Sequence, residues 1–419
     1  MRDVLVLGIG TSGLTAALRC QEAGLSVTLL AKGVGSTHLA PGTIDVLGYG
    51  PELVESPSEA LSQFIHGSPE HPYARIGTDT VSRSLEWFGG RFDAYRYSGS
   101  VDENLLLPTA IGSIKPSALV PESLSAGDVR NGGRFLIVGL RQLKDFFPAL
   151  VAQNMANAKT PSGAGISARA VQIEPPTNGE PDLSSLAFAR RFDESGFLDA
   201  VATQIGAHLD GDESVGLPAV LGVQHPHEVW SGLQDALGRP VFEIPSLPPS
   251  VPGIRLYETL RAQFEAGGGR IVVGAEAVGA ETNGDRVTAV RVATAARVKP
   301  YPARNFVLAT GGFGSGAIEM AADWSVREKV FNLPVAGVPE DASERFGHRY
   351  FDAHPLSRAG IRVDESLRPL DENGNRVYAN VTVVGACLAG SEAWREKSGE
   401  GISLSSGYKA AGTIVEEQK

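Results

Sequence analysis

The chain contains 419 residues, of which 42% are hydrophobic, and it carries a formal net charge of −11 at pH 7. A chain of this length and composition can bury a large core and is expected to form more than one domain. The acidic balance and the absence of any run of Lys or Arg exclude a nucleic-acid-binding surface, because that binding needs clustered cations.

Cysteine and histidine spacing gives no sign of a metal site. Cys20 and Cys387 lie far apart, and His225 and His227 form a close pair in a segment of uncertain structure. The N-terminal residues 1–10 have the pattern of a buried strand rather than a signal peptide, and no apolar run is long enough to span a bilayer. We therefore expect a cytoplasmic protein with reduced thiols and no metal, which would reach a membrane only through a partner.

The first predicted elements form a β-α-β unit. Residues 3–7 are a continuous apolar run, residues 14–22 have helical spacing, and residues 25–30 are apolar again. The unit has the expected length of about 30 residues. It predicts a parallel sheet that begins at residue 3.

Three glycines lie at the turn between this strand and helix. Gly8, Gly10 and Gly13 match the pattern G-x-G-x-x-G, in which glycines permit a tight turn, a close approach of backbone to phosphate, and close packing of helix on strand. A helix N-terminus also presents unpaired N–H groups that stabilise an anion. The pattern predicts nucleotide binding, and the alternative is a tight turn without a ligand.

The second strand ends without the acid that usually follows it. Such an acid accepts hydrogen bonds from the ribose of an adenosine half, and here Ala31 and Lys32 stand in its place. Lys32 is either close to a phosphate or solvated at a strand end. The missing acid favours FMN, which has no second ribose, although backbone groups can also hold a ribose and FAD stays the alternative.

Small residues gather in the next stretch, "GVGSTHLAPGTIDVLG" at positions 33–48. Ser36, Thr37, Gly42 and Thr43 surround His38, and small side chains allow backbone to approach a planar ring. This favours a flavin over a nicotinamide cofactor. A plain Gly/Pro loop would show the same composition.

The sequence pattern of helices and strands is weaker between residues 52 and 245, where Pro-rich stretches separate candidate helices such as 140–153. It returns with a helix marked by apolar residues at four-residue spacing and ended by glycines at 267–269. Asn283-Gly284 then predicts a type I′ hairpin turn. The stretch "ARNFVLATGGFGSG" follows as a strand that ends in glycines.

Several of these stretches resemble known flavoproteins. "STHLAPGTIDVLG" and "FVLATGGFGSG" resemble flavin-contacting segments of the succinate dehydrogenase, fumarate reductase and L-aspartate oxidase group. "EKVFNLPV", "HPLSRAGIRVDESLRP" and "WREKSGEGISLSSGYKAAG" more closely resemble the B subunits of anaerobic glycerol-3-phosphate dehydrogenases. The resemblance is strong over residues 3–48 and 303–412.

The resemblance implies an α/β fold of the Rossmann-like FAD/NAD(P)-binding type, a three-layer ββα flavoprotein fold with an inserted α+β cap or substrate domain. We place flavin-binding segments at 1–50, 251–320 and 375–419, the insert at 51–250, and a substrate-side region at 321–374.

The resemblance also implies a function. It is that of a flavoprotein subunit working beside an FAD-containing catalytic partner and an iron–sulfur membrane-anchor partner of the same complex, at the inner face of the cell membrane. The family oxidises sn-glycerol 3-phosphate to dihydroxyacetone phosphate and passes electrons to quinone. We expect noncovalent FMN, because the spacing around His38 differs from that of relatives with covalent flavin. The alternatives are a flavin-holding scaffold protein and a flavin-dependent oxidoreductase of another small acid.

Candidate site residues follow from the same matches. His354 resembles a substrate-contacting histidine and Arg395 resembles an arginine that binds substrate carboxylate; an arginine fork also fits phosphate. The alternative for His354 is a loop-stabilising role. Backbone N–H groups at the start of the last helix would stabilise the reduced ring. The expected flavin-contacting residues beyond the first loop are Thr310, Gly311, Gly312, Gly385, Gly399, Gly401 and Ile402.

Overall fold

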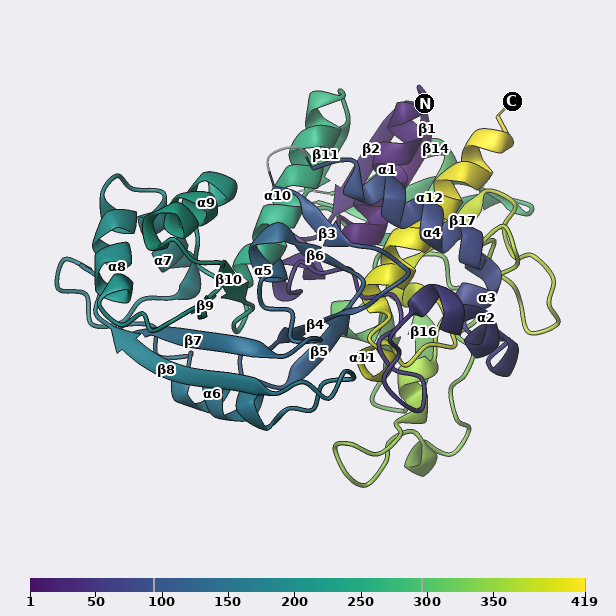
Figure 1. The fold of residues 1–419 in the computed structure, drawn as a ribbon. Coiled ribbons are helices and arrows are strands. Elements are labelled where there is room, and N and C mark those ends of the chain that lie inside the picture. Colours follow the sequence, from purple (N-terminus) through teal and green to yellow (C-terminus); the bar gives the residue numbers. More distant parts are fainter. Residues whose placement is uncertain (93–94, 295–296, 419) are drawn as a thin grey trace.

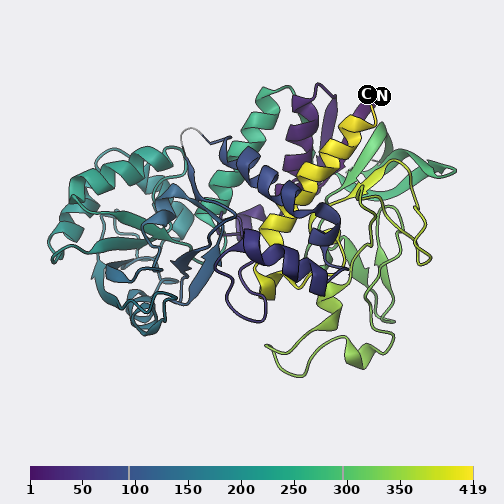
Figure 2. The same ribbon diagram turned by 45° about the vertical axis from the view of Figure 1, so that its right-hand side comes forward.

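The fold is described from a computed structural model, which defines residues 1–92, 95–294 and 297–418. Two bodies with separate hydrophobic cores lie side by side (Figure 1). The first contains both ends of the chain (Figure 2). The second is built from the middle of the chain and is drawn in blue-green to teal.

A parallel sheet forms the centre of the first body. In spatial order its strands are β11 (Arg270–Val273), β2 (Val27–Ala31), β1 (Arg2–Leu7), β14 (Val298–Leu308) and β17 (Val381–Val383). The parallel pairing confirms the predicted β-α-β unit. The carboxyl ends of β1, β14 and β17 therefore meet at one edge, where ligands of such sheets usually bind.

Helices and a β-ribbon complete three layers, as the predicted ββα fold requires. Helices α1 (Thr11–Glu22), α10 (Val251–Ala266) and α12 (Gly399–Glu416) lie side by side (Figure 1). Strands β12 (Glu276–Asn283) and β13 (Arg286–Ala293) continue from β14 as an antiparallel ribbon. Helix α1 begins three residues before the predicted residue 14, so that Gly13 lies inside it.

The predicted hairpin is confirmed, but its turn type differs. Asn283 still pairs with Arg286, so the two loop residues are Gly284 and Asp285. Only Gly284 has a positive φ, of 60°. A type I′ turn needs positive φ at both central residues, so the Asn-Gly signal located the hairpin one residue too early.

The second body contains its own sheet. Strands β10 (Val241–Ile244), β9 (Ser214–Pro218), β7 (Gly133–Leu140) and β8 (Ile166–Ile173) lie in this order and are all parallel. Its helices are α6 (Pro148–Asn157), α7 (Ser185–Phe192), α8 (Phe197–Gly206) and α9 (Pro226–Leu237). The insert is thus more regular than the α+β arrangement we expected, because strands alternate with helices. Helix α6 begins at Pro148 rather than at residue 140, which ends β7.

Short elements connect the two bodies. Helices α2 (Pro57–Gly67), α3 (Pro72–Ile76) and α4 (Thr78–Gly89) contribute to the first core, and α3 and α4 pack against α12. Two antiparallel strand pairs, β3 (Tyr97–Gly99) with β6 (Leu119–Pro121) and, between them in the chain, β4 (Leu105–Pro108) with β5 (Ile114–Ser117), precede α5 (Glu122–Ser125). Strands β15 (Ile318–Met320) and β16 (Val326–Glu328) and helix α11 (Ala393–Glu396) lie near the C-terminal region.

The second core contains residues between Leu106 and Ile244. The division of the chain into five segments, made from the sequence, stays a prediction.

None of the helices in the described ranges has the length and apolar character needed to cross a bilayer.

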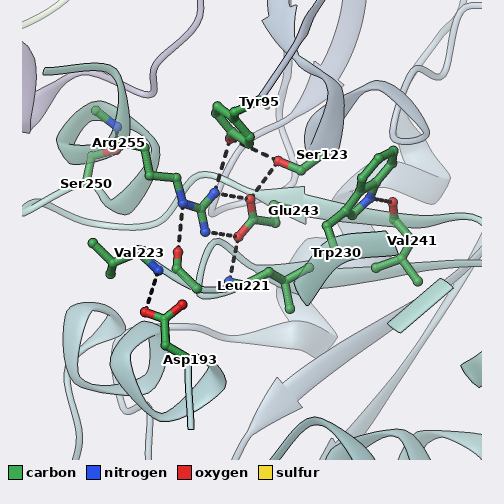
Figure 3. Close-up of polar contacts among 12 residues, drawn as sticks. Tyr95, Ser123, Asp193, Leu221, Val223, Trp230, Val241, Glu243, Ser250 and Arg255 are labelled. Atoms are coloured by element: carbon green, nitrogen blue, oxygen red, sulfur yellow. Dashed lines mark hydrogen bonds and ion pairs between the residues drawn. The ribbon is translucent and has the colours of Figure 1, made fainter. Parts of the chain in front are cut away.

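A buried ion pair joins the two bodies (Figure 3). Arg255 of α10 donates two hydrogen bonds to the carboxylate of Glu243 on β10, at 2.6 and 3.0 Å, and a third to the carbonyl of Gly222 at 2.8 Å. The carboxylate also accepts bonds from the Ser123 hydroxyl and the Leu221 N–H, both at 2.7 Å. Burial opposes the charge on Arg255, but Glu243 outweighs it and holds the pKa of Arg255 above its ordinary value.

Replacing Arg255 by Met is expected to reduce the free energy of unfolding by about 3–5 kcal/mol, because it leaves the Glu243 carboxylate buried without its cation. The matched control is Arg141→Met, which removes an exposed arginine paired with Glu174 at 3.8 Å and is expected to change stability by less than about 1 kcal/mol. Urea unfolding of both variants measures the difference. Equal losses would show that the buried pair does not hold the bodies together.

Candidate functional site

The glycines of the first turn have two different tasks. Gly8 has a φ of +112°, and a Cβ there would overlap the carbonyl oxygen of Ala309 at the end of β14. A Cβ on Gly13 would overlap the carbonyl oxygen of Gly8. These two glycines therefore close the turn against the neighbouring strand and pack the helix on the turn.

Gly10 is the N-cap of α1, and within the described residues nothing lies within 4 Å of a Cβ built on it. No side chain caps the helix, and its first turn contains no acidic residue. The first N–H groups of α1 are thus available to an anion, and this fits the phosphate of a nucleotide.

At the end of β2, Ala31 and Lys32 stand where an acid usually follows the strand. Ala31 is buried, and the Lys32 ammonium forms an exposed ion pair with Glu276 of β12 at 3.0 Å. The hydrogen bond from Lys32 lowers the pKa of Glu276. A phosphate contact by Lys32 stays a prediction.

The loop after β2 lies against both the first turn and α10. Residues Ser36–Leu39 form a short 3-10 helix, in which Ser36 is exposed and the buried Thr37 hydroxyl lies 3.5 Å from the Thr11 hydroxyl of α1. Gly42 has a φ of +78° and lies against Pro252 of α10. The loop is therefore held beside the anion-accepting end of α1.

One ring nitrogen of His38, in this loop, has no hydrogen-bond partner among the described residues. Its ring meets the edge of Tyr257 with the centroids 4.6 Å apart, and burial lowers the pKa of His38. Its Nε2 is buried and has no hydrogen-bond partner in the described part of the chain. A buried nitrogen without a partner is unfavourable, so it fits contact with a ligand.

The turn after β14 meets the segment after β17. A Cβ on Gly312 would lie 2.7 Å from the carbonyl oxygen of Ala386, and Gly311 has a φ of +80°. The Cys387 thiol donates to the carbonyl of Gly311 at 3.0 Å and lies 3.6 Å from the Thr310 hydroxyl. Burial raises the pKa of Cys387 to about 12, so this thiol acts as a packing group.

Gly385 brings the last helix to the first. Its φ is +69°, and a Cβ on it would lie 2.6 Å from the Ser12 Oγ of α1 and 3.6 Å from the Ser403 Oγ of α12. Its N–H donates to the Ser406 hydroxyl at 2.9 Å. The first turn, the 310–312 turn and the start of α12 thus meet at one edge of the sheet.

The amides at the start of α12 are already partly used. The Gly401 N–H donates to the Asp45 carbonyl, and the Ile402 N–H donates to the Ser398 carbonyl, both at 2.9 Å. The bare Cα of Gly401 allows the Tyr73 hydroxyl and Asp45 to approach, and a Cβ on Gly399 would meet the Ala393 side chain. Contact of Gly399, Gly401 and Ile402 with a flavin ring stays a prediction. The dipole of α12 would act on such a ring without the N–H groups of Gly401 and Ile402.

His354 and Arg395 lie on either side of one loop. Nδ1 of His354 accepts from the Gly347 N–H at 3.1 Å, so Nε2, 2.9 Å from the Tyr350 carbonyl, is the donor. Arg395 donates to the carbonyls of Phe351 and Asp352, both at 2.8 Å. The structure therefore places these two predicted residues at the same loop, and both hold it in this conformation.

Arg395 also lines a pocket of about 720 Å³ between α2 and the segment before α12. Arg358 and Arg395 share one buried carboxylate there, that of Glu392, at 3.5 Å each. The His71 ring contacts the Glu396 carboxylate at 3.1 Å. The two arginines of this pocket thus share a single acid, Glu392.

A charged cluster next to the loop after β2 was not predicted. Lys115 of β5 lies 2.5 Å from the Asp45 carboxylate and 2.9 Å from the Thr43 hydroxyl, and Ser117 donates to Asp45 at 2.7 Å. Burial and the Asp45 charge raise the pKa of Glu400, at the start of α12, to about 7. Glu400 stands between two glycines and Asp45 lies three residues after Gly42, so the sequence contained a signal for both, whereas nothing marked Lys115.

The comparisons with known proteins agree with this geometry. The family model described as "FAD binding domain" matches residues 3–402. The fold also resembles that of a 3-ketosteroid Δ1-dehydrogenase from Sterolibacterium denitrificans, with a TM-score of 0.50, 12% identity and 99% of each chain covered. The chain is therefore a flavoprotein of the FAD-binding fold.

Two relatives in sequence show which family of flavoproteins contains this chain. A Halobacterium salinarum protein, named as the B subunit of a probable anaerobic glycerol-3-phosphate dehydrogenase, is 35% identical over 99% of this chain and 98% of its own length. A Vibrio cholerae protein, named as the B subunit of an anaerobic glycerol-3-phosphate dehydrogenase, is 30% identical over 99% and 96%. The chain belongs to the family of these B subunits, as the resemblance predicted.

The two kinds of glycine in the first turn give a test of the anion site. Gly10→Val is expected to abolish flavin retention and to leave the melting temperature of the flavin-free chain unchanged, because only a bound phosphate would occupy the space of the new side chain. Gly13→Val is expected to destabilise the fold itself, since its Cβ meets backbone. The control is Gly206→Val, which also has open space around its Cβ but lies on α8. Absorbance near 450 nm and thermal unfolding measure both effects, and a fully yellow Gly10→Val protein would show that the phosphate lies elsewhere.

The raised pKa of Glu400 gives a pH test. Between about pH 4.5 and 7 the folded chain holds a proton on Glu400 that the unfolded chain has released, so this group makes stability fall as pH rises through that window. Glu400→Gln is expected to remove this part of the slope and to be more stable than the native chain above pH 7. Urea unfolding at pH 5, 6, 7 and 8 measures it, with the exposed Glu174→Gln as the control. An unchanged slope in Glu400→Gln would contradict the assignment.

Proposed function

We propose that the chain is the flavin-binding subunit of a multi-subunit glycerol-3-phosphate dehydrogenase, in which sn-glycerol 3-phosphate becomes dihydroxyacetone phosphate. The observation that carries the proposal is the uncapped start of α1 at Gly10, which lies where the three glycine-rich turns meet. The names of its relatives support the substrate and describe one component of a larger assembly.

We propose FAD, held without a covalent bond, as the cofactor. The missing acid at Ala31 favoured FMN, but the family model is that of an FAD binding domain and gives FMN no support. The ribose argument was weak for a physical reason: backbone groups can hold a ribose as well as a carboxylate can. A bound flavin would supply hydride-accepting chemistry.

The residues of this chain would hold such a group in distinct ways. The first N–H groups of α1 would bind phosphate, and the loop around Thr37 and Gly42 would accept the ring system because its residues are small. The unpartnered Nε2 of His38 would accept a hydrogen bond from the bound group. Glu400, whose pKa lies near neutrality, would hold or release a proton beside that loop.

We further propose that electrons leave through an FAD-containing catalytic partner and an iron–sulfur membrane-anchor partner toward quinone, which would place this chain at the inner face of the cell membrane. A second candidate function is that of a flavin-holding component that supports oxidation in its partner. It is favoured by His354, whose two ring nitrogens are both bonded within the chain and leave no free base at that position.

Acid extraction of the purified protein followed by mass measurement tests the cofactor, and release of FAD in a ratio close to one per chain is expected. Release of FMN would overturn the assignment of FAD, and a colourless protein that cannot be reconstituted would overturn flavin binding. Turnover of sn-glycerol 3-phosphate by the chain alone, compared with the co-expressed assembly, separates oxidation in this chain from a supporting role.

A further inference from the structure

The end of β2 and the uncapped start of α1 lie at the same edge of the sheet. Strands β1 and β2 are parallel, so their carboxyl ends share this edge with Gly10, the N-cap of α1. The loop after β2 returns to it, since a Cβ on Gly35 would lie 3.2 Å from the Gly10 nitrogen. In dinucleotide sites of this kind, an acid after the second strand binds the ribose of the adenosine half. This chain has no acid at that position of the sequence.

Another strand brings an acid to the end of β2. Strand β11 pairs with β2 as far as Val273, which lies opposite Ala31 (Figure 1). Gly274 then turns the chain with a φ of +76°, and the Ala275 N–H donates to the Ala31 carbonyl at 3.0 Å. Glu276, the first residue of β12, therefore follows directly after a backbone hydrogen bond to the last residue of β2.

Two lysines hold one oxygen of the Glu276 carboxylate and leave the other free of hydrogen bonds. Oε1 of Glu276 lies 3.0 Å from the Lys32 ammonium and 3.7 Å from that of Lys329. Lys32 occupies the position that usually carries the acid, so its side chain links that position to Glu276. None of the hydrogen bonds among the described residues uses Oε2, and 38% of the Glu276 side chain is exposed. Oε2 is thus an acceptor that a ligand can reach.

We propose that Glu276 binds the ribose hydroxyls of the adenosine half of FAD, in place of the acid that is missing after β2. An ionised carboxylate accepts hydrogen bonds only, and the two neighbouring ribose hydroxyls can donate to it. The inference deepens the proposed function and rests on FAD as its cofactor. It also explains why Ala31 does not favour FMN: the acid is absent from the sequence position but present in space.

Glu319 of β15 is the competing acid, and its position fits less well. It is exposed to the same extent as Glu276 and also pairs with Lys329, at 3.0 Å, and with Arg327, at 3.1 Å. However, β15 pairs with β16 and not with the sheet that contains β2, and no ion pair within the described ranges joins Glu319 to Lys32. Glu319 therefore offers a matched control for a change at Glu276.

The test measures, by titration calorimetry, how tightly the flavin-free chain binds FAD and an FAD analogue whose adenosine ribose lacks both hydroxyls. The native chain is expected to bind FAD at least tenfold more tightly than the analogue. Glu276→Gln should weaken FAD at least tenfold and leave the analogue within twofold, because a hydrogen bond to the charged carboxylate forms only where the ligand has a hydroxyl. Glu319→Gln should leave both ligands within twofold.

The variant at Glu276 is expected to fold. Lys329 keeps its ion pair with Glu319, and Lys32 is largely exposed, so Glu276→Gln leaves no buried charge without a partner. Unchanged binding of the analogue by Glu276→Gln would show directly that the rest of the site is intact.

The outcomes separate the role of Glu276 from the proposed function. A native chain that does not distinguish FAD from the analogue, native FAD affinity in Glu276→Gln, or equal losses for both ligands would each overturn the role of Glu276, while FAD as the cofactor would stand. A native chain that binds no FAD, or that releases FMN on extraction, would overturn the proposed cofactor and this inference with it.

Discussion

The buried pair of Arg255 and Glu243 fixes how the two halves of the molecule meet. Both groups are fully buried, so each depends on the other for its charge to be tolerated. Two residues before Arg255, Gly253 packs directly on the carbonyls of Thr37 and Ala40 in the loop after β2. One turn of α10 therefore sets the position of the inserted body and of that loop at the same time.

Sequence periodicity was sufficient for the elements with strong local signals. The apolar runs 3–7 and 25–30, the helix at α10 and the strand before the 310–312 turn are where they were predicted. It was insufficient between residues 52 and 245, because strands such as β7 are continuous apolar runs, which cannot be told from buried helix by spacing. The helix predicted at 140–153 was wrong in its first eight residues, because Leu140 ends β7 and residues 141–147 form turns before α6 begins at Pro148.

The candidate site was predictable where a backbone requirement selects glycine. Gly8 and Gly385 need positive φ and close contact, so the residue type reveals the constraint. Lys115, by contrast, reaches Asp45 across 70 positions of sequence, and no local pattern marks such a pairing. The roles of His354 and Arg395 were drawn from resemblance, and the structure adds that each secures the loop between them.

The second body has a consequence for how this architecture can vary. Its core comes from one uninterrupted stretch of chain with a parallel sheet of its own. The second body could therefore be exchanged as a module while the first body is kept unchanged. A graft from a related protein would have to supply two things: an acid on its edge strand to meet the arginine of α10, and a hairpin that delivers a cation to the start of the last helix. Any exchanged module must therefore match these two charges as well as the shape of the contact.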